Sequence, residues 1–174
     1  MRLIVFEAWK NQVVRTMQEN VPQFEFVEGH DPGDEKKLLK FSWAATPNLL
    51  CGAAFRPLDE AFDVFVGWST NGRFPYSASR RAKFNGNAWD FDQVAVMVSL
   101  ATLSERNGVA FWQLWNPPDD LADRPEEFGK AYAAYCGAEL THEAARELVA
   151  QPVREAVAEL AEFGISYLHK RIEG

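Results

Sequence analysis

The sequence is poor in three features that would narrow its function: cysteine, long apolar runs and positive charge. Cys51 and Cys136 are the two cysteines, and two widely separated thiols do not make the disulfide framework of a small secreted protein. No stretch approaches the roughly 18 apolar residues of a membrane span. The start of the chain, up to Gln12, is too short and too polar for a signal peptide. We therefore expect a cytoplasmic protein that does not bind membranes.

The net charge of −7 at pH 7 argues against general nucleic-acid binding, because phosphate backbones are bound by clustered Lys and Arg. Such an acidic protein suits a basic partner. A chain of 174 residues is most simply one domain that removes roughly 70% of its unfolded surface from water. Aromatic residues make up 13% of the chain, which fits either a bulky core or a stacking surface.

Signatures of catalysis and metal binding are also missing. His142 is followed by glutamate as in a metalloprotease helix, but Arg146 stands where the second histidine belongs. The three histidines lack the spacing of zinc ligands. The acidic clusters at 30–35 and 119–123 lack the ordered spacing of a calcium loop. The sequence predicts no cofactor and no metal, and it favours a protein that is not an enzyme.

The stretch 38–69 predicts a three-strand antiparallel meander. In its first run, Leu39, Phe41 and Trp43 alternate with polar residues, as in a strand with one buried face. Similar alternation recurs in two further runs, 49–55 and 62–68. The reversals at Thr46–Asn48 and Arg56–Glu60 are too short for a parallel crossover, which needs a dozen or more residues.

Helical spacing marks both ends of the chain. Phe6, Trp9, Val13 and Met17 recur every three or four residues, which predicts a helix from Leu3 to about Glu19 that lies on the meander. Towards the other end, three helices are expected: one from a cap at Asp123 to Gly137 with Phe128, Tyr132 and Tyr135 as its packing side, one from a Thr141 cap to about Ala150, and one from Val153 to Ile172. Pro152 either starts the last helix or kinks the one before it.

Three shorter elements complete the expectation. Phe24–Glu28 alternates like a short edge strand. The run Val94–Leu103 is apolar nearly all round, and we predict a helix capped by Asp90, although its valines also permit a strand. Val109–Trp115 is predicted as a strand, with a place beside the meander as one option. The predicted fold is a single α+β domain, residues 1–174, with an antiparallel sheet of four to five strands packed against an N-terminal helix and two or three C-terminal helices.

Residues 70–89 differ from the rest of the chain, because they contain cations and aromatic rings but no acid. Asn-Gly dipeptides at 71–72 and 85–86 predict a long loop or a hairpin with a basic tip. Arginine and aromatic residues are common in binding hot spots. We predict that this loop binds a protein partner or an anion through Arg73, Phe74, Tyr76, Arg80, Arg81, Lys83 and Trp89. The alternative is that the cations pair with the protein's own carboxylates and the rings fold inward.

The favoured function is therefore a non-catalytic protein-binding module, of the kind found in inhibitors and immunity proteins. One alternative is a small-molecule binder or enzyme whose pocket lies between sheet and helices, with Trp43, Trp68 or Tyr76 as walls and Arg73 or Arg80 holding an anion. A second alternative is a subunit of a homo-oligomer in which 94–103 forms the contact.

Overall fold

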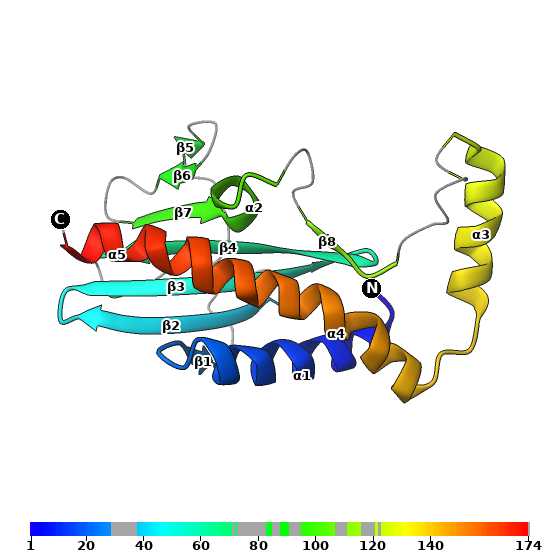
Figure 1. The fold of residues 1–174 in the computed structure, drawn as a ribbon, viewed down its shortest axis with the longest axis horizontal. Helices are drawn as coiled ribbons and strands as arrows, with labels where there is room; N and C mark the ends of the chain where they lie inside the picture. Colours follow the sequence, from blue (N-terminus) through cyan, green and yellow to red (C-terminus); the bar gives the residue numbers. More distant parts are fainter. Residues whose placement is uncertain are drawn as a thin grey trace.

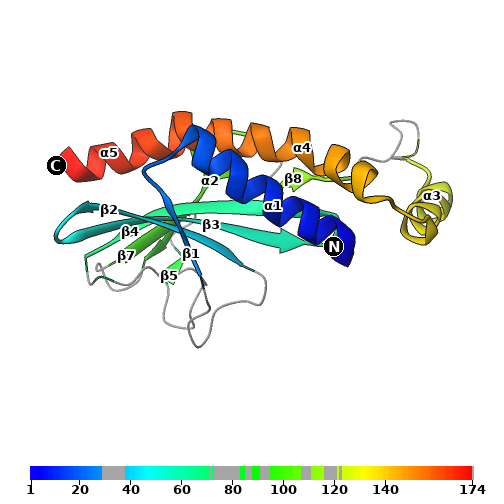
Figure 2. The same ribbon diagram turned by 90° about the horizontal axis from the view of Figure 1, so that it is seen from below.

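An antiparallel sheet carries the fold, and helices lie along one of its faces (Figures 1 and 2). The computed structural model describes residues 1–28, 38–70, 72, 83–84, 88–90, 95–106, 111–115, 121 and 123–173, and for 83–84 and 88–90 it describes the backbone alone. The predicted α+β class is confirmed: a helix precedes the sheet and further helices follow it.

Within the part of the chain that the structure describes, the sheet has eight strands, more than the predicted four to five, because short strands follow the meander. The meander is confirmed as β2, β3 and β4, and β1 is the predicted edge strand beside β2. The spatial order is β1-β2-β3-β4-β7-β6-β5, while β8 pairs with part of β4. The bounds are β1 Glu25–Val27, β2 Leu39–Thr46, β3 Leu49–Leu58, β4 Ala61–Ser69, β5 Lys83–Phe84, β6 Ala88–Asp90, β7 Ala95–Ser99 and β8 Trp112–Gln113.

Strand β3 runs further than the predicted reversal at Arg56–Glu60. It continues to Leu58, and the turn is the dipeptide Asp59-Glu60. Pro57 is tolerated in this strand because the pairing of β2 with β3 ends at Leu39 opposite Phe55. Beyond that point, the missing N–H of proline removes no bond of the ladder.

The predicted helix over 94–103 is wrong for most of its length. Residues 95–99 form β7, a short helix α2 (Leu100–Leu103) follows, and Asp90 lies in β6 instead of capping a helix. β7 lies between β4 and β6, so both of its edges are paired. Ala95, Met97 and Val98 are buried, which explains why this strand is apolar on both faces.

The helices match the spacing of their apolar residues. α1 (Leu3–Asn20) is confirmed, and its buried side chains face the sheet. A continuous helical rod follows the Thr141 cap, whose hydroxyl oxygen accepts a hydrogen bond from the N–H of Ala144. The rod consists of α4 (His142–Glu159), the π-helical segment η2 (Leu160–Gly164) and α5 (Ile165–Glu173), with Pro152 inside α4.

Aromatic rings form the centre of the core between the sheet and these helices. Phe62 of β4 is fully buried, and its ring stacks on Trp112 with a centroid distance of 5.7 Å. Trp9 of α1 lies 5.7 Å from Phe62 on another side, and Phe55 lies 6.4 Å away. The aromatic richness of the sequence is therefore explained in part by the core. Among the described helices, none has the length and apolarity needed to cross a bilayer.

Candidate functional site

Helix α3 (Pro125–Gly137) stands at one end of the molecule, away from the sheet (Figure 1). The structure describes all of its 13 residues, and none of them is buried. Phe128 and Tyr132 are each 36% exposed. A helix of this length is marginal on its own in water, so α3 depends on the few contacts it makes with the rest of the chain.

Phe128, Tyr132 and Tyr135 line one side of α3, four and three residues apart, and we call them the α3 stripe. All three surround Trp115, with ring centroids 5.6, 5.3 and 5.2 Å from it. The sequence identified this packing side correctly. It did not reveal that the stripe packs on a single tryptophan outside the core, which leaves two of its rings partly exposed.

Polar contacts hold the C-terminal end of α3. The hydroxyl of Tyr135 donates to Glu60 Oε2 at 2.7 Å. The guanidinium of Arg2 lies 4.3 Å from the centroid of the Tyr135 ring, and its Nη1 donates to the carbonyls of Tyr135 and Ala138 at 3.1 and 3.3 Å. Carbonyls at a helix C-terminus lack helical partners and attract cations. We call the contacts among Arg2, Glu60 and Tyr135 the latch.

Glu60 occupies an unusual backbone position within the latch. Its φ is +53°, a left-handed conformation that costs a residue with a Cβ about 1–2 kcal/mol. Its carbonyl accepts a hydrogen bond from the N–H of Leu114 at 2.9 Å, so the same residue holds both the segment before α3 and α3 itself. The turn contacts the chain start as well, because Asp59 accepts from the amino group of Met1 at 3.2 Å. A strained residue with these contacts suggests a functional position.

Both tyrosines near the latch are protonated at neutral pH. Burial, followed by the hydrogen bond to Glu60, raises the pKa of Tyr135 to about 12, although Arg2 acts in the opposite direction. The pKa of Tyr132 is also raised, chiefly by a hydrogen bond with Cys136. Proton transfer at neutral pH needs a group with a pKa near 7. Neither hydroxyl is therefore matched to proton transfer at neutral pH.

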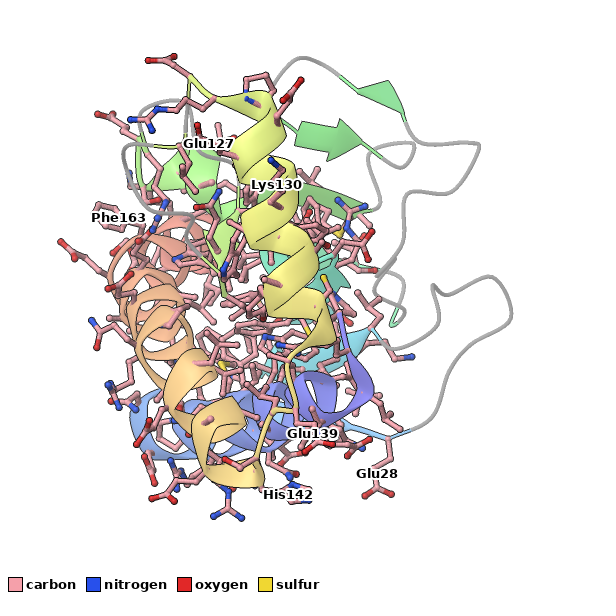
Figure 3. All side chains as sticks on the ribbon, turned by 90° about the vertical axis from the view of Figure 1, so that its right-hand side faces the viewer. Glu28, Glu127, Lys130, Glu139, His142 and Phe163 are labelled. Atoms are coloured by element: carbon pink, nitrogen blue, oxygen red, sulfur yellow. The ribbon has the colours of Figure 1, made fainter. Side chains whose placement is uncertain are left out.

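Along the described residues 123–139, acidic side chains outnumber basic ones. Figure 3 looks onto this helix and shows Glu127 and Lys130 on it, with Glu139 just after its end. Arg124, just before the helix, donates to Glu127 at 3.0 Å, so this cation is already paired. We call the acids of this region the acidic rim, and they are Asp59, Asp123, Glu126, Glu127 and Glu139.

The loop that the sequence analysis selected is largely outside the described residues. This applies to Arg73, Phe74, Tyr76, Arg80 and Arg81. Lys83 and Trp89 lie in β5 and β6, which pair antiparallel with Lys83 opposite Asp90, and their side chains are not described. Binding through this loop stays a prediction.

The tryptophans that were alternative pocket walls lie beneath α5. Trp43 contacts His169 with ring centroids 5.8 Å apart, and the Arg171 guanidinium lies 4.2 Å from the ring centroid of Trp68. Leu168, the residue before His169 in α5, is fully buried. The helix therefore occupies the space over both tryptophans.

A cavity of about 430 Å³ lies elsewhere, between α4 and the segment 111–114. Trp112, Leu148 and Pro152 are among its lining residues. The Nε1 of Trp112 is buried and has no hydrogen-bond partner among the described residues. Arg106 also lines the cavity, but it already pairs with Glu159 and lies over the Trp112 ring.

Comparison with known proteins does not extend these observations. Searches of family models, of characterised proteins and of solved structures find no match to this chain. Sequence reasoning identified the α3 stripe as a packing side, but no local signal pointed to Glu60 or Arg2, which lie 75 and 133 residues from Tyr135.

Proposed function

We propose that this chain is a non-catalytic protein-binding module and that it binds its partner through the α3 stripe. The observation that carries the proposal is a 13-residue helix without a buried residue that leaves Phe128 and Tyr132 each 36% exposed. Aromatic side chains grouped on a protruding helix are typical of contacts with another protein.

The geometry of the α3 stripe favours recognition of the helix in a groove. Phe128, Tyr132 and Tyr135 have the i, i+4, i+7 spacing of anchors that an amphipathic helix places into an apolar groove. The acidic rim adds a charge preference. We therefore propose a protein partner whose apolar groove is bordered by Lys and Arg, since complementary charge steers association and selects the partner.

The proposal is tested by removing the exposed rings. The double variant Phe128→Ala/Tyr132→Ala is compared with the wild-type protein in affinity capture from native extract, and the captured protein is then purified and titrated against both. We expect the double variant to bind at least about tenfold more weakly, the loss that corresponds to about 1.4 kcal/mol. Wild-type affinity should also fall as salt is raised, because salt screens the acidic rim.

A matched control removes exposed side chains at the far end of the molecule. Lys170 and Glu173 lie in the last turns of α5, at the opposite end from α3 (Figure 1). The variant Lys170→Ala/Glu173→Ala should bind like the wild type. Equal affinity of the α3 variant and this control would contradict the proposal.

The loop predicted over residues 70–89 is a second candidate surface, and the same binding titration tests it. If the loop predicted from sequence makes the contact, Arg80→Glu/Arg81→Glu should abolish binding without lowering the melting temperature. If α3 makes it, this variant should bind like the wild type. Comparing the two double variants therefore assigns the binding surface, and the inhibitor or immunity class stays a narrower hypothesis within the proposal.

A second candidate function is small-molecule binding in the cavity between α4 and 111–114. The lining of this cavity supports it, because the apolar side chains of Leu148 and Pro152 stand beside polar ones such as Gln113 and Gln151. Ligand-observed NMR with a library of small aromatic and aliphatic fragments tests this candidate. Hits should lose their signal in a Leu148→Trp variant that fills the cavity, and hits that persist unchanged would count against it.

A further inference from the structure

The contacts of α3 differ from those of the long helices α1 and α4. α1 and α4 each bury five or more residues against the rest of the chain, whereas α3 buries none, and among the described residues it is held by Trp115 and by the latch. Regions with few buried apolar contacts open locally at a much lower free energy than the whole protein unfolds. Opening of α3 leaves the aromatic centre around Phe62 intact, because Trp115 and the α3 stripe lie outside the buried core.

Trp115 lies against the side of α3 that we propose binds the partner. The side of α3 that suits a partner's groove is the side that already surrounds Trp115 at 5.2–5.6 Å. A partner that takes all three rings of the α3 stripe must therefore displace Trp115. The hydrogen bond from its hydroxyl to Glu60 holds Tyr135 beside Trp115.

We propose that the latch holds α3 in a closed position in which Trp115 occupies the binding side of the helix, and that the partner binds after the latch opens. This regulation rests on the proposed function, since it concerns the same helix. The apparent affinity for the partner is then the affinity of the open form multiplied by the fraction of molecules that are open. Weakening the latch should then strengthen binding, whereas damage to an ordinary contact surface weakens it.

Glu60 allows a variant that removes the hydrogen bond between Glu60 and Tyr135 and suits the backbone conformation of the turn. Glu60→Gly removes the carboxylate that accepts from Tyr135, and glycine adopts the positive φ of this position without a steric penalty. Glu60→Gln is the matched control, because it keeps an oxygen acceptor at nearly the same place and loses only the charge. Tyr135→Phe removes the same hydrogen bond from the other side.

Hydrogen exchange measured by mass spectrometry reports the opening without any partner. In Glu60→Gly and in Tyr135→Phe, we expect the amides of α3 to exchange at least about tenfold faster than in the wild type. Amides of α1 and β3 should be unchanged, and Glu60→Gln should lie between the wild type and Glu60→Gly. The combined variant Glu60→Gly/Tyr135→Phe should exchange like either single variant, since both substitutions remove the same hydrogen bond. Unchanged exchange of α3 in both single variants would overturn the latch.

Binding is measured with the purified protein that affinity capture of the full chain provides. We expect Glu60→Gly and Trp115→Ala to bind it at least about threefold more tightly than the wild type does. Faster exchange together with equal or weaker binding would overturn the inhibitory role of the closed position. That result is distinct from failure of the proposed function, which is decided by the variant Phe128→Ala/Tyr132→Ala alone.

Discussion

The centre of the core can be tested by truncating Phe62. Its side chain is fully buried and contacts the rings of Trp9, Phe55 and Trp112, with the Trp112 ring stacked at an interplanar angle of 16°. The variant Phe62→Ala removes a ring from the middle of three others. None of these neighbours can fill the space without leaving its own packing, because protein interiors are close-packed.

The magnitude follows from this lack of room to relax. Truncation of a buried phenylalanine costs about 3–5 kcal/mol, and each lost aromatic pair contributes about 0.5–1.5 kcal/mol within that range. We expect about 4 kcal/mol for Phe62→Ala. This is a large part of the roughly 5–15 kcal/mol by which domains are stable. With a urea slope of about 2 kcal/mol/M, the unfolding midpoint should fall by about 2 M.

The same substitution on α3 is the control. Phe128 contacts Trp115 but is 36% exposed, so Phe128→Ala should cost about 1 kcal/mol or less. Urea unfolding followed by circular dichroism measures both variants. A fall of less than about 0.5 M for Phe62→Ala, or equal falls for the two variants, would refute the distinction between the core and α3.

Three further predictions concern single positions. The pKa of Tyr135 rises from 10.0 to about 12 on folding. The stability that the protonated Tyr135 contributes is therefore complete below pH 10 and is lost as pH rises from about 10 to 12. The difference in 295 nm absorbance between wild type and Tyr135→Phe should show this late titration. Burial raises the pKa of Cys51 to about 11, while Cys136 is exposed, so one thiol should react quickly with Ellman's reagent at pH 8 and the second only in urea. A Cβ at Gly67 would lie 1.9 Å from the carbonyl oxygen of Val96, so Gly67→Ala should destabilise the protein by about 3 kcal/mol in urea unfolding.

Each of these predictions has a control or a result that would contradict it. A tyrosine titration near pH 10 for position 135 would contradict the hydrogen bond to Glu60. The variant Cys136→Ser should lack the fast thiol, and fast reaction there would mean that Cys51 is accessible. Gly129→Ala places a Cβ in open space on α3 and should be neutral or stabilising by up to about 1 kcal/mol. Similar effects at Gly67 and Gly129 would contradict the close approach of β4 and β7.

The errors in the sequence reasoning arose where one pattern fits two structures. The run 94–103 is apolar on all sides, which suits a buried helix as well as a strand paired on both edges. β7 took the second form because β4 and β6 lie on either side of it. Similarly, β3 extends past Pro57 because its neighbour β2 has already ended there, a condition that only the pairing register reveals.

The sequence by itself determined the α+β class, the meander, α1 and the α3 stripe, because alternation and helical spacing depend on residues close together in the chain. The tertiary structure alone decided what each apolar side packs against. The α3 stripe reads like any core-facing side, but its partner is Trp115, and the contacts that hold it come from Arg2 and Glu60. Contacts between residues so distant in sequence leave no periodic signal, so they depend on how the whole chain packs.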